Sequence, residues 1–204
     1  MARSEAHAAK VAPIARTMGK IVNLMSAEDL QPTNHEWLWR HLMAAGSLHL
    51  IAGAPATGKT SVALSLAATL SRGDLWPDGS PARAARAVVW SGEDHTTSTL
   101  LPRLIAQGAD LAKISIVGNT LEDGRARPFD PSIDLQDLKR QLCTLDNVGL
   151  LVIDPIISVV TGDSHKNAEV RRGLQPLVEL AAEVGALRDR LRPRRRGRSG
   201  QGSA

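Results

Sequence analysis

Residues 47–60, Ser-Leu-His-Leu-Ile-Ala-Gly-Ala-Pro-Ala-Thr-Gly-Lys-Thr, decide the fold of this chain. The apolar run 47–52 predicts a short buried strand, and the small and apolar residues at helical spacing in 59–70 predict a helix that ends at Gly73. Gly53–Thr60 lies between them and matches the phosphate-binding loop pattern G-x-x-x-x-G-K-S/T at every fixed position. A strand, a glycine-rich turn and a helix in this order indicate a nucleotide-phosphate site.

Each fixed residue of the loop has a physical task. Gly53 and Gly58 allow backbone torsions that point amides inward at phosphates, and the helix that follows adds the positive end of its dipole. Lys59 is predicted to reach the β- and γ-phosphates of ATP, and Thr60 to place its hydroxyl on Mg²⁺. A chance glycine-rich turn with a solvated lysine is the alternative, which the flanking strand and helix disfavour. The predicted nucleotide-binding residues are Gly53, Ala54, Pro55, Ala56, Thr57, Gly58, Lys59, Thr60 and Ser61.

A second candidate is Asp154, which follows the fully apolar predicted strand 150–153. Ligands bind beyond the carboxyl ends of strands in open α/β sheets, and a carboxylate there can hold Mg²⁺. An aspartate that ends a strand is by itself more often a turn residue. Together with the phosphate-binding loop, the pattern favours Asp154 as a catalytic magnesium ligand.

Glu93 and Asp94 follow another apolar run, the predicted strand 87–90. A glutamate at this position can orient or deprotonate the water that attacks the γ-phosphate, so Glu93 is the predicted general base. Asp94 is a candidate cap for the helix that follows. In the alternative interpretation, both acids are helix N-terminal residues that the helix dipole favours.

Short buried strands alternate with helices along the rest of the chain. This alternation predicts an α/β fold, a RecA-like P-loop NTPase in which helices cover both faces of a parallel central sheet. Gly173 and Pro176 are expected to weaken or kink the last helix. The further predicted elements are a helix at 36–45, a surface loop at 75–86, a helix at 96–107, a strand at 114–117, a helix from an Asp130–Pro131 cap to Thr144, and a helix at 167–184.

The charge of the chain is unevenly distributed. The net charge is +4, but residues 188–204 hold seven arginines and one aspartate, 7 − 1 = +6, so the other residues sum to 4 − 6 = −2. The basic character therefore belongs to a tail, and five aromatic residues leave few platforms for stacking bases. The expected organisation is a leader at 1–20, an incomplete ATPase core at 21–187 and an arginine-rich disordered tail at 188–204.

Composition also limits the cellular setting. The longest apolar run, 148–160, is interrupted by Asp154 and Pro155, so no membrane-spanning helix is expected. The first twenty residues lack the apolar core of a signal peptide. A single cysteine, Cys143, excludes an internal disulfide and a site of several thiolates, and it is expected to be a small buried residue. These features predict a cytoplasmic protein.

Four segments together carry a family resemblance: GAPATGKT (53–60), WSGED (90–94) with Arg103 after it, LLVIDP (150–155) and GDSHKNAEVRR (162–172). From about residue 17 to 186 the chain resembles the RecA-fold AAA-family ATPases related to RepA, the hexameric replicative helicase of plasmids and phages. The resemblance implies ATP and Mg²⁺ as cofactors, Glu93 as the catalytic base, and Arg103 packed on adenine. It also implies a homo-oligomer, a hexamer in the intact family, that moves single-stranded DNA, with the loop 161–172 on the channel side. There His165, Lys166, Arg171 and Arg172 would touch phosphates; the alternative is that they are solvated loop residues.

The chain departs from the resemblance after Ala186. Relatives continue into an apolar strand that ends in a histidine, whereas residues 187–204 are rich in arginine, glycine and serine and resemble a change of reading frame. In the family's strand order, the missing strand lies between the phosphate-loop strand and the Asp154 strand. The sheet is therefore expected to be incomplete, and the chain to be poorly stable with little or no ATPase activity. The leading hypothesis is a helicase-type ATPase acting on single-stranded DNA. The alternatives are an inactive nucleotide- or nucleic-acid-binding remnant and a small P-loop kinase.

Overall fold

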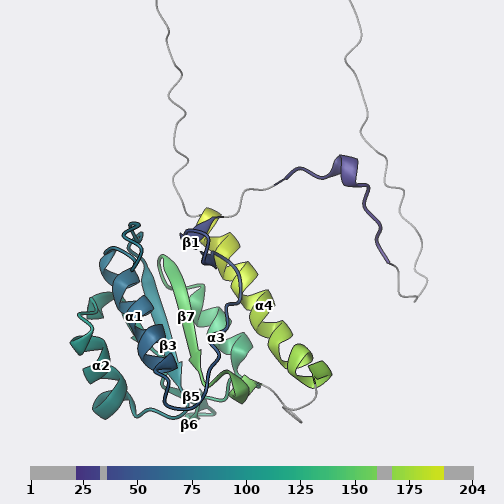
Figure 1. Ribbon diagram of the computed structural model, residues 1–204. Coiled ribbons are helices and arrows are strands. Elements are labelled where there is room, and N and C mark those ends of the chain that lie inside the picture. Colours follow the sequence, from purple (N-terminus) through teal and green to yellow (C-terminus); the bar gives the residue numbers. More distant parts are fainter. Residues whose placement is uncertain (1–21, 33–35, 160–166, 191–204) are drawn as a thin grey trace, which may run out of the picture. The chain divides into compact units, whose positions relative to one another are not determined.

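A computed structural model describes residues 22–32, 36–159 and 167–190 of the chain, as two units, 1–34 and 35–204. The first unit contains a short 3₁₀ turn, η1 (Ala27–Asp29), whose flanking residues are solvent-exposed. All other elements belong to the second unit (Figure 1). No helix among the described residues is long and apolar enough to cross a membrane.

A three-stranded parallel sheet forms the centre of the second unit. β3 (Arg86–Ser91) lies between β4 (Ile114–Ile116) and β7 (Val148–Asp154). β3 pairs with β7 along its whole length, from Arg86 opposite Val148 to Ser91 opposite Asp154. The sequence prediction of a parallel α/β fold is therefore confirmed.

Helices cover both faces of this sheet, as the period-2 alternation of β3 requires. Ala87 and Val89 pack against α1 (Lys59–Arg72) and α2 (Leu101–Ala106), which a π-helical turn, η2 (Thr96–Leu100), precedes. Val88 and Trp90 lie in the opposite core, with side chains of α3 (Leu135–Leu142) and α4 (Asn167–Arg190). Figure 1 shows the two helix pairs on either side of the strands. The predicted strands at 87–90, 114–117 and 150–153 and the predicted helices at 59–70, 96–107 and 167–184 are all present.

The prediction of a helix at 36–45 is wrong. Residues in this range form a small antiparallel pair, β1 (Trp37–Trp39) and β2 (Met43–Ala44), with His41 at φ 64° in the connection. The Trp39 ring stacks on Trp76 at 5.1 Å between centroids, and its indole N–H donates to Asp78. These contacts with the loop 75–86, in which Trp76 is buried, override the local helical pattern.

A hairpin that the sequence analysis did not predict lies between β4 and α3. It consists of β5 (Asn119–Glu122) and β6 (Arg125–Pro128), joined by Asp123 and Gly124 at φ 50° and 76°. Positive φ at both central residues is the type I′ arrangement, for which Asp-Gly is a preferred sequence.

The helix predicted from Asp130 begins later, at Leu135 as α3, and ends at Leu142. The Asp130 carboxylate accepts hydrogen bonds from the backbone N–H and the hydroxyl of Ser132, so it closes a local turn instead of capping a helix. The Asp134 side chain turns back to the hairpin, where it binds Arg127 and Thr120. The start of α3 is therefore set by a contact with β5 and β6. Cys143, expected to be buried, is exposed just after α3.

The strand predicted at 47–52 does not form. Among the described residues, β7 pairs with β3 alone, and residues 47–52 belong to no strand. The Leu50 and Ile51 side chains remain 57% and 46% exposed. A strand exists only as a member of a ladder, and this segment forms none in the described chain, although the second edge of β7 is also unpaired there.

Candidate functional site

The phosphate-binding loop and the predicted magnesium ligand meet at the carboxyl end of the sheet. Thr60, in the first turn of α1, donates its hydroxyl hydrogen to the Asp154 carboxylate at the end of β7, with 2.5 Å between the oxygens. These two residues are 94 positions apart in the chain. The fold thus brings together two residues that the sequence analysis had selected separately.

Left-handed backbone conformations shape the loop itself. Gly58, which precedes α1, has φ 85°, a conformation that strains any residue with a Cβ, and Ala56 also has positive φ, 62°. At Gly53, an added Cβ would come within 3.0 Å of the Thr57 hydroxyl, which donates to the Ala54 carbonyl. Turns of this kind, followed by a helix N-terminus, expose successive backbone N–H groups to an anion.

The Lys59 ammonium group folds back over the loop. Its Nζ donates to the carbonyls of Gly53 and Ala54, at 3.1 and 2.8 Å. Both partners are neutral, and Lys59 forms no ion pair with a carboxylate in the part of the chain that the structure describes. The loop is also largely exposed. A polyphosphate would therefore meet an accessible, uncompensated positive charge.

The donor set at this point fits a magnesium ion bound together with phosphates. Mg²⁺ takes oxygen ligands and commonly uses one or two protein groups plus the substrate's phosphates. The Thr60 hydroxyl and the Asp154 carboxylate are two such oxygens. No cluster of three or more His, Cys, Asp or Glu side chains suited to a metal occurs among the described residues. The chemistry of this set therefore matches a cation that arrives with its nucleotide.

Glu93 follows β3, the strand next to β7, and lies at the same carboxyl end of the sheet as Asp154. Ser91 is opposite Asp154 in the ladder, and the Gly92 N–H donates to the Asp154 carbonyl at 2.9 Å. The Ser91 hydroxyl oxygen accepts from the backbone N–H groups of Glu93 and Asp94, at 3.3 and 3.0 Å. Ser91 thus fixes the turn that carries Glu93, a supporting role that the sequence analysis missed.

Arg103 and Asp94 pair with each other. The guanidinium of Arg103, on α2, donates to the Asp94 carboxylate at 2.9 Å across an exposed surface. The prediction that Asp94 caps the following helix is therefore wrong: its carboxylate binds Arg103, and η2 has no side-chain cap. Gln107 is a second residue that the sequence did not indicate, and its amide ties α2 to α1 by donating to the Ser61 carbonyl at 3.1 Å.

The predicted DNA-contacting loop, 161–172, is described only from residue 167, where the chain is already helical as part of α4. His165 and Lys166 lie outside the described residues. Arg171 and Arg172 lie in the first turns of α4 with exposed side chains, and Arg172 donates to the Ala168 carbonyl of its own helix. Both guanidinium groups are accessible to an external phosphate.

A parallel sheet, a glycine-rich loop before α1 and a carboxylate at the end of β7 define a P-loop nucleotide-binding protein. The comparison with known families agrees, because the AAA domain family matches residues 16–187. The chain belongs to this family of AAA-type P-loop ATPases. Comparisons with curated proteins and with solved structures gave no match.

Proposed function

We propose that the chain binds ATP with Mg²⁺ at Gly53–Ser61 and hydrolyses it, as a RepA-like helicase-type ATPase that acts on single-stranded DNA. The observation that carries the proposal is the contact between the Thr60 hydroxyl and the Asp154 carboxylate, beside the uncompensated ammonium group of Lys59. These groups supply an anion site and a divalent-cation site next to each other, which is what a nucleoside triphosphate requires.

Each side chain has a defined role in the proposed hydrolysis. Lys59 exchanges the loop carbonyls for the β- and γ-phosphate oxygens. Thr60 and Asp154 would hold Mg²⁺, which would supply positive charge against the charge that develops on those oxygens. Glu93 accepts a proton from the attacking water while the oxygen of that water bonds to the γ-phosphorus. The bond from that phosphorus to the bridging oxygen breaks, and ADP leaves with the electron pair.

The helicase part of the proposal rests on the sequence resemblance and on two further observations. The guanidinium groups of Arg171 and Arg172, for which the resemblance implies DNA contacts, are exposed at the start of α4, which supports this part of the proposal. Arg103 is exposed enough to leave Asp94 and stack on adenine, since surface ion pairs contribute only about 0 to 1 kcal/mol. In this proposal the working form is a hexamer.

A second candidate function is nucleotide binding without turnover. The observation that favours it is the unpaired segment 47–52, which leads directly into the loop and leaves Leu50 and Ile51 exposed. A loop without a fixed strand behind it can still order around a phosphate, but it holds the reacting groups less firmly. Loss of position by about 1 Å can reduce a rate about 10²-fold.

Calorimetry of ATP binding in the presence of Mg²⁺ tests the site. We expect Lys59→Ala to lower the affinity at least tenfold, because the polyphosphate loses its main point charge. Lys113→Ala is the matched control, since Lys113 lies before the amino end of β4, paired with Asp110. Equal affinity of the Lys59→Ala variant and the unmodified chain would refute the assignment.

Phosphate release, measured with and without single-stranded DNA, separates the two candidate functions. The helicase-type ATPase predicts DNA-stimulated release that falls about 10²-fold or more in Glu93→Gln, with ATP binding retained, because an amide cannot accept the proton. Binding without release in the unmodified chain supports the second candidate. Loss of ATP binding in Glu93→Gln would give Glu93 a structural role instead.

A further inference from the structure

The proposed general base, Glu93, has no side-chain contact that determines its position. Within residues 22–32, 36–159 and 167–190 its carboxylate takes part in no hydrogen bond or ion pair, and the residue is exposed. A general base must come within about 2.6 to 3.2 Å of the water from which it takes a proton. The position of the Glu93 carboxylate therefore depends on the backbone turn that carries it.

The Ser91 hydroxyl group organises this turn. Its oxygen accepts hydrogen bonds from the backbone N–H groups of Glu93 and Asp94, at 3.3 and 3.0 Å. Serine hydroxyl groups that bond the backbone two and three residues further along the chain stabilise compact turns. Ser91 is the last residue of β3 and is partly buried, so the sheet holds this oxygen in place.

Gly92 confines the path of the chain within the turn. A Cβ at this position would come within 2.9 Å of the Trp90 ring and within 3.7 Å of Cδ of Pro155. Trp90 is only 7% exposed, so its ring has little room to move away. The Gly92 N–H also donates to the Asp154 carbonyl at 2.9 Å. The turn is therefore attached to the sheet on one side of Glu93 by two separate hydrogen-bonding groups.

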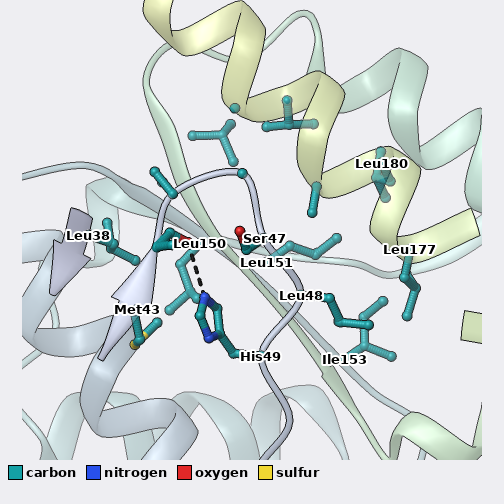
Figure 2. A pocket seen from close by; sticks show the side chains of 18 of the residues that line it. Leu38, Met43, Ser47, Leu48, His49, Leu150, Leu151, Ile153, Leu177 and Leu180 are labelled. Carbon is teal, nitrogen blue, oxygen red and sulfur yellow. Dashed lines mark hydrogen bonds between the residues drawn. The ribbon is translucent and has the colours of Figure 1, made fainter. Parts of the chain in front are cut away.

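The same contacts link the turn to the strand that carries the candidate magnesium ligand. Ser91 lies opposite Asp154 in the ladder, and in the described chain β7 pairs with β3 alone. An apolar cavity of about 170 Å³, lined by Leu150, Leu151 and Ile153, borders the rest of β7 (Figure 2). The end of β7 therefore takes its position from β3, and the Ser91 hydroxyl connects that end of the sheet to the general base.

We infer that Ser91 is a positioning residue for ATP hydrolysis: through the two N–H groups that it binds, it holds the Glu93 carboxylate at the attacking water. The inference rests on the proposed function and adds a residue that acts on the rate of the chemical step. The Ser91 hydroxyl forms none of the contacts within the phosphate-binding loop, so ATP binding does not depend on it. A displacement of reacting groups by about 1 Å can reduce a rate about 10²-fold.

Phosphate release and ATP binding by Ser91 variants test the inference on the full chain. We expect Ser91→Ala to lower kcat about tenfold or more while the Kd for ATP with Mg²⁺ changes by less than about twofold. Ser91→Thr keeps the hydroxyl oxygen and should restore most of the lost rate. Ser98→Ala, which removes a hydroxyl group from an exposed residue of η2, is the matched control and should keep the full rate. An unchanged kcat in Ser91→Ala, or a Kd that rises as much as kcat falls, would overturn the inference.

A double-mutant cycle separates positioning of the base from a general loosening of the site. If Ser91 acts through Glu93, adding Ser91→Ala to Glu93→Gln should lower the remaining rate by less than about twofold. The same fold loss in both backgrounds would show that Ser91 acts independently of Glu93, and the inference would be wrong. If the unmodified chain releases no phosphate, the proposed hydrolysis and this inference both fail. Release that Ser91→Ala does not change removes the inference alone.

Hydrogen exchange examines the turn without relying on turnover. In Ser91→Ala the amides of Glu93 and Asp94 should exchange about threefold faster or more, because they lose their acceptor, whereas those of Ala87–Val89 should keep their rates. Unchanged exchange at Glu93 and Asp94 would contradict the assigned role of the hydroxyl group. Faster exchange throughout β3 would mean that the variant loosens the sheet, which also contradicts it.

Discussion

The two edges of β7 belong to one strand and have opposite surroundings. On one side, β3 pairs with β7 along its length, and the β3 residues Ala87 and Val89 are almost completely buried. On the other side, the apolar segment 47–52 forms no ladder and leaves Leu50 and Ile51 about half exposed. β3 and segment 47–52 both have strand-like sequences. The difference shows that apolar pattern supplies only the propensity, and that a partner at hydrogen-bonding distance decides whether a strand forms.

Leucine truncation gives the largest contrast between the two sides. Leu64→Ala in α1 removes a side chain that is 1% exposed, so we expect a loss of about 2 to 5 kcal/mol in the free energy of unfolding. Leu50→Ala should cost less than about 0.5 kcal/mol, because its side chain is 57% exposed. Urea unfolding followed by circular dichroism measures both. Similar losses would show that segment 47–52 is packed in solution.

Asp134 lies just before α3 and binds Arg127 of the β5–β6 hairpin. Its substitution tests how firmly this hairpin is fixed to the paired side of the sheet. The Arg127 guanidinium, with the Thr120 hydroxyl and the Asp130 N–H, holds the pKa of this buried carboxyl well below its usual range. The charged form is thus favoured in the folded state, so its stabilisation is complete above about pH 4 and is lost as pH falls further. Asp134→Asn should cost about 2 to 3 kcal/mol at pH 7.

The pH dependence provides the control for this prediction. Between pH 5 and pH 2 the Asp134→Asn variant should lose less stability than the unmodified chain, because it lacks the carboxylate whose protonation breaks the cluster. Asp146→Asn, at an exposed position before β7, should leave the acid profile unchanged. Parallel acid profiles for Asp134→Asn and the unmodified chain would contradict the assigned role.

A glycine pair gives the smallest and sharpest comparison. A Cβ at Gly149, on β7, would meet the Ala85 Cβ at 2.7 Å, and one at Gly185, on α4, would meet the Gly46 Cα at 2.7 Å. Gly149→Ala should cost about 1 to 3 kcal/mol, since the core around Ala85 and Leu70 cannot yield. Gly185→Ala should cost less than Gly149→Ala, because the preference of alanine for a helix, about 1 kcal/mol, offsets part of the clash with the Gly46 backbone. Thermal unfolding measures the loss of stability in both variants. A larger loss in Gly185→Ala than in Gly149→Ala would contradict this prediction.

Local sequence predicts the elements whose causes are local. The loop glycines, the start of α1 at Lys59 and its end at Gly73 follow from short-range chemistry, and Gly73 has the left-handed cap conformation expected of it. The hairpin turn at Asp123–Gly124 has an equally local cause, since Asp-Gly is a preferred dipeptide of two-residue hairpin turns. The Ser91 support of the Glu93 turn carries no pattern that would have indicated it.

The elements that local sequence does not predict correctly depend on partners outside their own segments. The β1–β2 pair replaces a helix because Trp39 stacks on Trp76, far along the chain. The delayed start of α3 reflects the contact of Asp134 with Arg127. Segment 47–52 differs in kind, since it has an apolar pattern but forms no ladder in the described chain. In each case the deciding factor lies outside the segment itself, and local periodicity cannot contain it.

The resting hydrogen bonds of the phosphate-binding loop have a consequence for ligand discrimination. In the free loop, the Lys59 ammonium group already donates to two loop carbonyls, and the Thr60 hydroxyl donates to Asp154. These side chains therefore have hydrogen-bond partners before any ligand binds. A ligand must replace these bonds rather than add to them, and each replacement needs different chemistry. A lone phosphate can recruit Lys59 but offers the Asp154 carboxylate only repulsion, and a lone cation suits Asp154 but repels Lys59. The internal hydrogen bonds therefore favour one class of ligand, an anion that carries its own divalent cation. Only such a ligand replaces all of these bonds without electrostatic repulsion.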